Sequence, residues 1–556
     1  MEKNINRRQF NKTLLSGAAG FMLGFRLNNR FNVIIKNGLI IDGAGGPAVL
    51  QDIGITGDRI AAIGDLKDAA ADTIIDADGM AVSPGFIDIH THTDIELLVN
   101  PDGEGKIRQG ITTEVSGNCG YSPFPLNDAD YSELDAAIFE KYGFHINWKE
   151  IGGFLEALEE NGISLNYATF TGHGNLRAFV MGKNDAQPTP EQMKSMKDVL
   201  ARSMEKGSLG LSSGLEYAPG SYAKTEELIE LSRVAAKRGG VYATHMRNED
   251  DRVEEAVREA LRICREAEVS LQISHLKACN KVNWYKADSL IRMIEDASQS
   301  GLPVHADRYP YTAWSTGLSS LLPLWSRQGD TEDVLARLND PKLLPKIREY
   351  ADTRSKNIGG WDRFLINSCY SPENKKFEGK SIEECAGMTN KTPFEFVRQL
   401  LIEEKNRVDI TGFAMDEGNL KKVLASPLVM IGSDGSVAAP YGPLSRSKPH
   451  PRYYGTFPRV LGKYSREEKV FDLPTAVKKM TSMPAEKLGL KGRGRLREGY
   501  FADVVVFNPE TVIDRATYIE PHQYPAGIEY VLVNGKITIA KGEHTGAHAG
   551  SVLRKS

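Results

Sequence analysis

Strand-like segments alternate with helical segments through the middle of the chain, and this order constrains the fold more than any other feature. Such alternation predicts a parallel sheet, because each strand must be joined to the next by a crossover connection, usually a helix. The strand candidates are residues 86–91, 112–117, 166–172, 209–213, 241–245, 271–275, 303–309 and 429–434. Eight such strands fit a closed barrel better than an open sheet, so we predict an α/β chain built on a (β/α)8 barrel.

The two ends of the chain have a different pattern, in which short β segments are separated by turn residues. Asn-Gly at 37–38, Gly-Asp at 57–58 and Asn-Gly at 534–535 each predict a hairpin. We therefore expect residues 31–83 and 491–556 to form one small β-sandwich domain from both chain ends. The barrel domain is expected at 84–490, and its segment 314–427 is too long for a simple loop. That segment is predicted to form a helical insertion over the barrel mouth.

Residues 1–30 are predicted to be an export signal that precedes the fold. The pair Arg7-Arg8 leads into an uncharged stretch at 13–25, which has the length of a signal-peptide apolar region and is too short to span a bilayer. The paired arginines resemble a twin-arginine signal, so we expect a periplasmic or exported protein. The alternative is a basic amino terminus without that role. No later segment is apolar enough to predict an integral membrane span.

Composition excludes some partners and one type of scaffold. The chain has 69 Lys and Arg against 73 Asp and Glu, a net charge of −4, which gives no electrostatic reason to expect nucleic acid as a partner. Five cysteines in 556 residues do not form a disulfide framework, so each must be judged by its neighbours.

Potential metal ligands occur at the carboxyl ends of several predicted strands. His90 and His92 end the first strand as His-Thr-His, and residues two apart in an extended strand point to the same side. The other candidates are Cys119 after the second strand, His245 and His275 at the ends of the fifth and sixth, and Asp434 at the end of the eighth. Each of these residues alone has an ordinary structural explanation. Together they predict one metal site, because barrel closure brings the strand ends to the same rim.

The types of ligand indicate the metal and the chemistry. Imidazole and thiolate donors favour zinc over calcium or magnesium, which prefer oxygen ligands. Bound zinc lowers the pKa of a coordinated water to roughly 7, so hydroxide becomes available as the nucleophile near neutrality. The carboxylate of Asp434 can accept the proton of that water and later donate one to a leaving nitrogen. Metal, hydroxide and one bifunctional carboxylate form a complete set for amide hydrolysis.

Short motifs around these residues are recognisable as a set. The first is GFIDIHTH at 85–92, and the others are SGNCG at 116–120, SGLEY at 213–217, THMRNE at 244–249, SHLK at 274–277, DRYPY at 307–311, GSDG at 432–435 and HPR at 450–452. The first motif resembles the opening signature of the amidohydrolase superfamily. The whole set resembles the N-acyl-D-amino-acid deacylases (D-aminoacylases), from about residue 31 to the end. Cys119 is the most specific element of this resemblance.

The resemblance implies roles for individual residues. A tight zinc is expected on Cys119, His245 and His275, with His90 and His92 at a second, weaker position and Asp434 as general base and acid. The free carboxylate of a small-molecule substrate is expected to be held by Arg452, Lys277 and Tyr217, with Tyr309 as a further substrate-binding residue. Many relatives use a carbamylated lysine from the fourth strand, but here that strand ends in Ser-Ser-Gly at 212–214, so Cys119 takes the bridging place.

The implied activity is hydrolysis of the amide bond of N-acyl-D-amino acids, or of peptides ending in a D-residue, to a carboxylate and a free D-amino acid. The preference for the D hand comes from the resemblance alone. Residues 436–449 form a longer stretch than the family pattern leads us to expect, and this segment bears on side-chain specificity.

Two other functions remain open at this point. One is a cyclic amide hydrolase of the dihydroorotase or hydantoinase kind, against which the missing fourth-strand lysine argues. The other is a barrel retained as a scaffold without catalysis, against which the complete ligand set and Asp434 argue.

Overall fold

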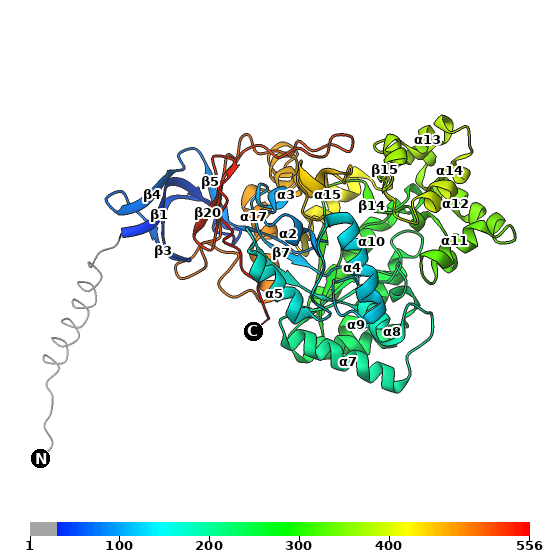
Figure 1. Cartoon of the computed structure of the whole chain (residues 1–556). Helices are drawn as coiled ribbons and strands as arrows, with labels where there is room; N and C mark the ends of the chain where they lie inside the picture. The colour runs from blue at the N-terminus through cyan, green and yellow to red at the C-terminus, as the bar shows by residue number, and fades with distance from the viewer. Residues whose placement is uncertain (1–29, 556) are drawn as a thin grey trace, which may run out of the picture.

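The computed structural model describes residues 30–555. A barrel lies at the centre of the molecule, with a small β domain on one side and a mixed insertion on the other (Figure 1). The export signal predicted at 1–30 lies outside the described residues apart from Arg30. Among the described residues, no helix is both long enough and apolar enough to cross a membrane.

The barrel is built from parallel strands that form two hydrogen-bonded runs. The first run is β6 (Phe86–Asp88), β7 (Ile111–Ser116) and β8 (Asn166–Thr169), and the second is β9 (Thr171–Gly172), β10 (Gly210–Gly214), β11 (Val241–His245), β12 (Ser270–Ile273), β13 (Val304–Arg308) and β17 (Val429–Ile431). Only Phe170 separates β8 from β9, so these two short strands form one stave of the barrel. A parallel bridge between Thr91 and Gly435 joins the region after β17 to the region after β6. The strand order is that of the predicted (β/α)8 barrel.

Helices pack around the ring of strands and cover its apolar outer face. Helix α7 (Pro190–Glu205) begins at Thr189, whose side chain forms the predicted capping box with Gln192. Its buried residues include Met196 and Leu200, which lie four apart on one helical face. The other helices of the barrel domain are α2 (Glu96–Val99), α3 (Glu104–Ile107), α4 (Asp128–Tyr142), α5 (Ile151–Asn161), α6 (His173–Met181), α8 (Thr225–Lys237), α9 (Val253–Ala267), α10 (Ala287–Gln299), α15 (Glu417–Ala425), α16 (Arg452–Arg459), α17 (Leu473–Met480) and α18 (Ser482–Leu488).

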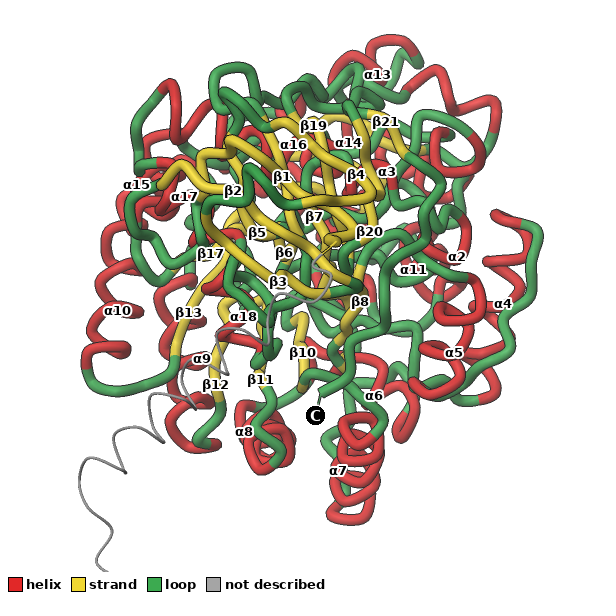
Figure 2. The backbone as a smooth tube through the Cα atoms, turned by 90° about the vertical axis from the view of Figure 1, so that its left-hand side faces the viewer, coloured by secondary structure: helices red, strands yellow, loops and turns green. Residues whose placement is uncertain are grey.

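The small β domain combines strands from both chain ends, as the sequence predicted. It contains β1 (Arg30–Ile40), β2 (Val49–Thr56), β3 (Arg59–Gly64), β4 (Ala70–Asp76), β5 (Ala81–Pro84), β18 (Val504–Phe507), β19 (Ile528–Val533), β20 (Lys536–Ala540) and β21 (Glu543–His544). These strands form one sheet that forks at β1, because β4 pairs with its first half and β5 with its second half. Figure 2 shows these strands lying over one end of the barrel. The two arms enclose an apolar core that includes Ile35, Ile53 and Val504.

One predicted hairpin is wrong. The chain does not turn at Asn37-Gly38, because β1 continues through both residues and pairs with β2 on either side of a register shift. Asn37 has φ of +60°, a conformation that serves a β-bulge as well as a tight turn. A Cβ on Gly38 would lie 2.4 Å from Cγ2 of Val82, so close packing against β5 also requires glycine there. The hairpins at Gly57-Asp58 and Asn534-Gly535 are present, between β2 and β3 and between β19 and β20.

The insertion predicted at 314–427 is only partly helical, and its last helix, α15, belongs to the barrel because it packs against α10 and β17. It contains the expected helices α11 (Thr331–Asn339), α12 (Leu344–Ile358), α13 (Ile382–Met388) and α14 (Pro393–Glu403). It also contains an antiparallel sheet that the sequence analysis did not predict, formed by β14 (Trp314–Gly317), β16 (Asp409–Gly412) and β15 (Phe364–Ser368). Leu321, Phe364 and Ile410 belong to a core of the insertion that is separate from those of the barrel.

Candidate metal centre and active site

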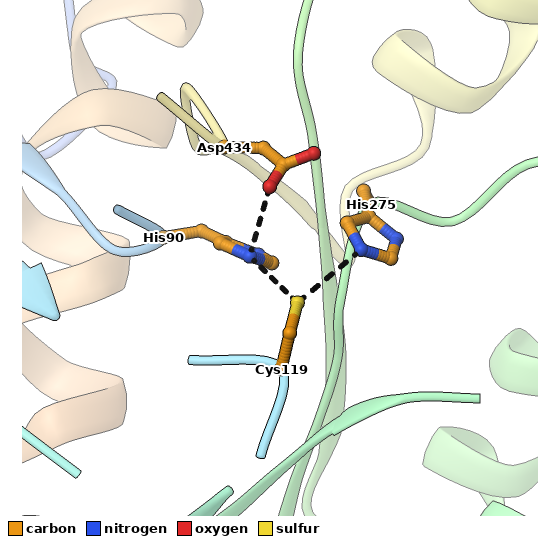
Figure 3. A group of neighbouring side chains, drawn as sticks. All are labelled: His90, Cys119, His275 and Asp434. Atoms are coloured by element: carbon orange, nitrogen blue, oxygen red, sulfur yellow. Dashed lines mark hydrogen bonds and ion pairs between the residues drawn. The ribbon is translucent and has the colours of Figure 1, made fainter. Parts of the chain in front are cut away.

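The predicted ligands converge at one end of the barrel. His90 lies two residues after β6, Cys119 three residues after β7, His275 two residues after β12 and Asp434 three residues after β17. One donor atom from each of these four side chains lies within 4.8 Å of those of the other three (Figure 3). The side chains of His90, His275 and Asp434 are buried, and that of Cys119 is half-buried. The outermost two, His90 and Asp434, lie more than three hundred positions apart in the sequence, so closure of the barrel brings them together.

Cys119 occupies the centre of this group. Its Sγ lies 3.4 Å from Nε2 of His90 and 3.6 Å from Nε2 of His275. Zinc bonds of about 2.3 Å to sulfur and about 2.1 Å to nitrogen, at a tetrahedral angle, separate the two donor atoms by about 3.6 Å. The donor separations therefore fit a zinc ion bound by the thiolate and either imidazole.

His245 completes the group on the side of β11. Its ring lies 4.6 Å from that of His275, centroid to centroid. Both ring nitrogens of His245 are buried and have no hydrogen-bond partner among the described residues. The nearest carboxylate oxygen of Glu216 is 3.7 Å from its Nε2. A buried imidazole without a partner is costly unless something else binds it, and a metal ion fits that requirement.

His92 and Asp434 form the opposite side of the group. Nε2 of His92 lies 3.0 Å from Oδ1 of Asp434, and the same oxygen is 3.4 Å from Nε2 of His90. The other carboxylate oxygen of Asp434 lies 2.8 Å from Nη1 of Arg452. Burial opposes ionisation of Asp434, but the charges of Arg452 and of the neighbouring histidines hold its pKa well below the usual range. Asp434 is thus ionised and faces both the histidines and the cavity.

The thiol of Cys119 is similarly predisposed to lose its proton. Burial alone would raise its pKa, but the adjacent His90, together with His245 and His275, holds it well below the usual value for cysteine. A thiolate is the form that binds zinc.

Three of the converging residues have left-handed backbone conformations. The φ angles are +51° at Cys119, +36° at His275 and +51° at Asp434, and none of the three is glycine. A residue other than glycine in such a conformation costs about 1–3 kcal/mol, and residues of this kind concentrate at functional sites. The surrounding structure must therefore hold each side chain in place.

Two buried carboxylates that sequence reasoning missed orient the histidines. Oδ1 of Asp307 accepts a hydrogen bond from the backbone N–H of His275 at 2.8 Å and lies 3.0 Å from Nδ1 of His90. Glu249 Oε1 lies 2.8 Å from Nδ1 of His275, and Nζ of Lys277 lies 2.9 Å from the same nitrogen. At His90, the Asp307 carboxylate on the remote nitrogen fixes the tautomer of the imidazole and leaves its Nε2 free for a metal. Both residues fall within motifs noted in the sequence, DRYPY and THMRNE, but nothing local distinguished them.

The fourth stave, β10, contributes Ser212, which contacts the loop that carries Cys119. The hydroxyl of Ser212 donates to the carbonyl of Gly117 and accepts from the backbone N–H of Gly120 at 3.1 Å. It thereby holds both ends of the short loop that carries Cys119.

The predicted substrate-binding residues line one large cavity together with the metal-site residues. The cavity has a volume of about 1550 Å³, and its walls include Arg452, Lys277, Tyr217 and Tyr309. Lys277 Nζ contacts Glu249 Oε1 at 2.5 Å, and the ring of Tyr217 lies 4.9 Å from that of His245. The Nε of Arg452 is buried without a partner among the described residues and is free to donate. The segment 436–449 also reaches this cavity, through residues that include Ser436, Ala438 and Pro449.

Comparison with known proteins identifies close relatives. Residues 73–539 match the sequence model described as the amidohydrolase family. The chain is 39% identical to the D-aminoacylase of Alcaligenes xylosoxydans xylosoxydans over 528 residues, which cover 95% of this chain and 98% of the relative. It is 37% identical to an N-acyl-D-glutamate deacylase of the same organism, over 92% of this chain and 94% of that protein.

Solved structures agree with this result. A D-aminoacylase structure that addresses a binuclear metal centre superposes with a TM-score of 0.79 at 39% identity, over 94% of this chain and 100% of that one. An N-acyl-D-glutamate deacylase from Bordetella bronchiseptica, solved with zinc and a phosphonate mimic of the tetrahedral intermediate, superposes with a TM-score of 0.79 at 35% identity. That match covers 95% of this chain and 100% of the other.

Proposed function

The chain belongs to the amidohydrolase family, in the branch of the N-acyl-D-amino-acid deacylases, and from this premise we propose that it hydrolyses N-acyl-D-amino acids. Peptides that end in a D-residue are included in the proposed substrate class. The products are the acyl carboxylate and the free D-amino acid. The observation that carries the proposal is the convergence of Cys119 and the histidines beside the ionised Asp434.

The residues that would hold zinc are Cys119, His245 and His275, with His90 and His92 at a second, weaker position that shares the thiolate. The fit rests on the separations around Sγ of Cys119 and on the unpartnered ring of His245. When bound, zinc supplies a Lewis acid and a water whose pKa is lowered to roughly 7.

Asp434 would transfer the proton that amide hydrolysis requires. Its Oδ1 faces the histidines, so it can accept a proton there while the carbonyl carbon of the substrate is attacked. It then donates that proton to the leaving nitrogen, which would otherwise depart as an unstable amine anion. Arg452, 2.8 Å from the other carboxylate oxygen, keeps Asp434 ionised before the reaction begins.

The substrate carboxylate would bind at the cationic wall of the cavity. Arg452 has a free, buried Nε, and both Arg452 and Lys277 line the cavity beside Tyr309, with Cζ and Nζ 4.9 Å and 5.9 Å from the centroid of its ring. An arginine can bind two anionic groups at once because its guanidinium has five N–H donors. Tyr217 and Tyr309 would close the site around the α-carbon of the substrate.

A cyclic amide substrate is the less supported alternative. An L-hydantoinase and a dihydropyrimidinase superpose on this chain at 18% and 16% identity, which shows the fold alone. The end of β10 also has no lysine to carbamylate, since Ser212 and Ser213 occupy it.

The test compares the D and L enantiomers of the substrate. The full chain is purified with zinc and assayed on N-acetyl-D- and N-acetyl-L-amino acids that carry matched side chains. We expect turnover of the D series and little of the L series. Activity confined to the L series, or to dihydroorotate and hydantoins, would refute the proposal.

We also propose that the protein is exported, on the basis of the sequence at 1–30. Replacing the pair by lysines (Arg7→Lys, Arg8→Lys) should retain the protein inside the cell, because a twin-arginine receptor reads the arginines themselves. Cell fractionation of the unaltered chain and of this variant provides the test. Equal distribution of the two would contradict the proposal.

A further inference from the structure

A fully buried ammonium lies behind the active site, where the last barrel strand meets the first. Lys106, in α3, has no exposed surface. Its Nζ donates to Ser433 Oγ at 2.8 Å and to the carbonyl of Gly435 at 3.2 Å. These two residues flank Asp434 on either side. One side chain therefore holds both neighbours of the proposed acid/base.

The same ammonium also contacts Asp88, the last residue of β6. It donates to Asp88 Oδ2 at 3.0 Å. The other oxygen of Asp88 accepts from the backbone N–H of Ser433 at 2.8 Å and from that of His90 at 3.4 Å. Lys106 and Asp88 thus form a clamp with Lys106 at its centre. The clamp joins the turn after β17 to the segment after β6 that carries His90 and His92.

The clamp encloses a backbone that is unfavourable by itself. Asp434 has φ of +51°, which a residue with a side chain rarely adopts. Two hydrogen bonds fix the turn. The backbone N–H of Asp434 donates to the carbonyl of His90 at 2.8 Å, and the backbone N–H of Gly435 donates to Ser433 Oγ at 3.1 Å. Ser433 Oγ is also the atom that receives the Lys106 hydrogen bond, so the ammonium orients the group that closes the turn.

We infer that Lys106 is a positioning residue for the acid/base. It holds the Ser433–Gly435 turn against β6, so that the Asp434 carboxylate faces the histidine cluster. This inference rests on the proposed role of Asp434. It goes beyond that role by assigning the geometry of the carboxylate to a residue that belongs neither to the candidate metal ligands nor to the lining of the cavity.

A second buried lysine, Lys479 in α17, provides a matched control because it contacts the same strand, β17. Lys479 is 1% exposed and donates to the carbonyls of Val429 and Ser426, at the opposite end of β17. Both lysines bind backbone carbonyls near this strand, but only Lys106 lies at the catalytic end. A purely structural role would give the two positions similar effects.

The test must distinguish the loss of the hydrogen bonds that hold the Ser433–Gly435 turn from the cost of leaving a buried charge unpaired. Lys106→Met alone would leave Asp88 buried and unpaired, which could prevent folding. The double variant Lys106→Met/Asp88→Asn removes both charges, while the amide oxygen of Asn still accepts from Ser433. Ser433→Ala removes the hydroxyl alone and leaves every charge in place.

For the double variant and for Ser433→Ala we expect unchanged zinc content and a KM within about twofold of the unaltered enzyme. The kcat should fall about tenfold to a hundredfold, the usual loss for a misplaced catalytic group. Hydrogen exchange of the peptide that contains 433–435 should accelerate in both variants. Lys479→Met should lower the melting temperature without changing kcat or exchange at 433–435.

Hydrogen exchange keeps this inference separate from the proposed function. If the unaltered chain fails to hydrolyse any N-acyl-D-amino acid, the proposed function fails, and exchange at 433–435 still decides whether the clamp exists. Unaltered kcat and unaltered exchange in the double variant overturn the inference. Equal loss of kcat in Lys479→Met also overturns it.

Discussion

Glu114 provides a quantitative test of the electrostatics behind the active site. It lies in β7 with no exposed side-chain surface, and neither carboxylate oxygen has a hydrogen-bond partner among the described residues. Its nearest cation is Nζ of Lys106, at 3.5 Å. Burial raises the pKa of Glu114 from 4.5 to about 7, and the charge of Asp88 adds to that rise while Lys106 opposes it.

The sign of the effect on stability follows from where the proton is bound. Between about pH 4.5 and pH 7 the folded protein keeps Glu114 protonated while the unfolded chain ionises it. Unfolding then releases a proton, so the free energy of unfolding falls as the pH rises. A shift from 4.5 to about 7, at about 1.4 kcal/mol per pKa unit, corresponds to roughly 3.5 kcal/mol in full. About 2.5 kcal/mol of that appears between pH 5 and pH 8.

Glu114→Gln removes this titration. We expect the difference in unfolding free energy, variant minus unaltered protein, to increase by about 2.5 kcal/mol from pH 5 to pH 8, and then to stay constant. Denaturant unfolding of the zinc-loaded full chain at several pH values measures it. Comparing two proteins at each pH cancels the titration of the zinc ligands. Glu510→Gln, at an exposed glutamate, is the control and should show no such trend. A constant difference for Glu114→Gln across this range would refute the argument that Glu114 is buried as a neutral acid.

Three further predictions concern the metal and the acid/base. Asp434→Asn should keep its zinc, by elemental analysis, yet lose about 10²–10⁴-fold in kcat, and near-normal turnover would exclude Asp434 as the proton carrier. Cys119→Ser should lose tightly bound zinc, because a serine hydroxyl does not ionise as the thiol does; full zinc occupancy after dialysis would contradict the ligand assignment. Asp307→Asn should weaken zinc binding about 10–100-fold in competition with a chelator, since it loosens His90 and the backbone of His275. Unchanged affinity would show that those two contacts do not orient the ligands.

The convergence of the candidate ligands could be predicted from sequence because their positions follow one rule. In a parallel barrel, chemistry lies at the carboxyl ends of the strands, and His90, Cys119, His275 and Asp434 all fall just beyond a strand that its apolar pattern reveals. The rule needs only strand positions. It does not require knowledge of which strands touch.

The supporting residues could not be predicted in the same way, because their roles depend on contacts across the barrel. Asp307 reaches His90 over 217 positions, and Lys106 reaches Ser433 over 327. A buried lysine in a one-turn helix has no local signal that separates it from a solvated one. The error at Asn37-Gly38 has a related cause, since the same local conformation serves a turn or a bulge and the pairing of β1 with β4 and β5 decides between them.

The proposed use of the Cys119 thiolate as a zinc ligand has a consequence for the reactivity of this cysteine, which yields the last prediction. Cys119 lines the cavity and is the one cysteine of the five that is not buried. Burial raises the pKa of the other four, to about 12 at Cys279 and Cys385, and likewise upward at Cys264 and Cys369. Because the thiolate is the reactive form, iodoacetamide should label the zinc-free protein at Cys119 alone, and bound zinc should protect that residue. Peptide mass mapping with and without zinc measures this. Labelling of Cys119 at the same rate in both samples would mean that the thiol does not bind the metal, and the ligand assignment would then fail even if the enzyme were active.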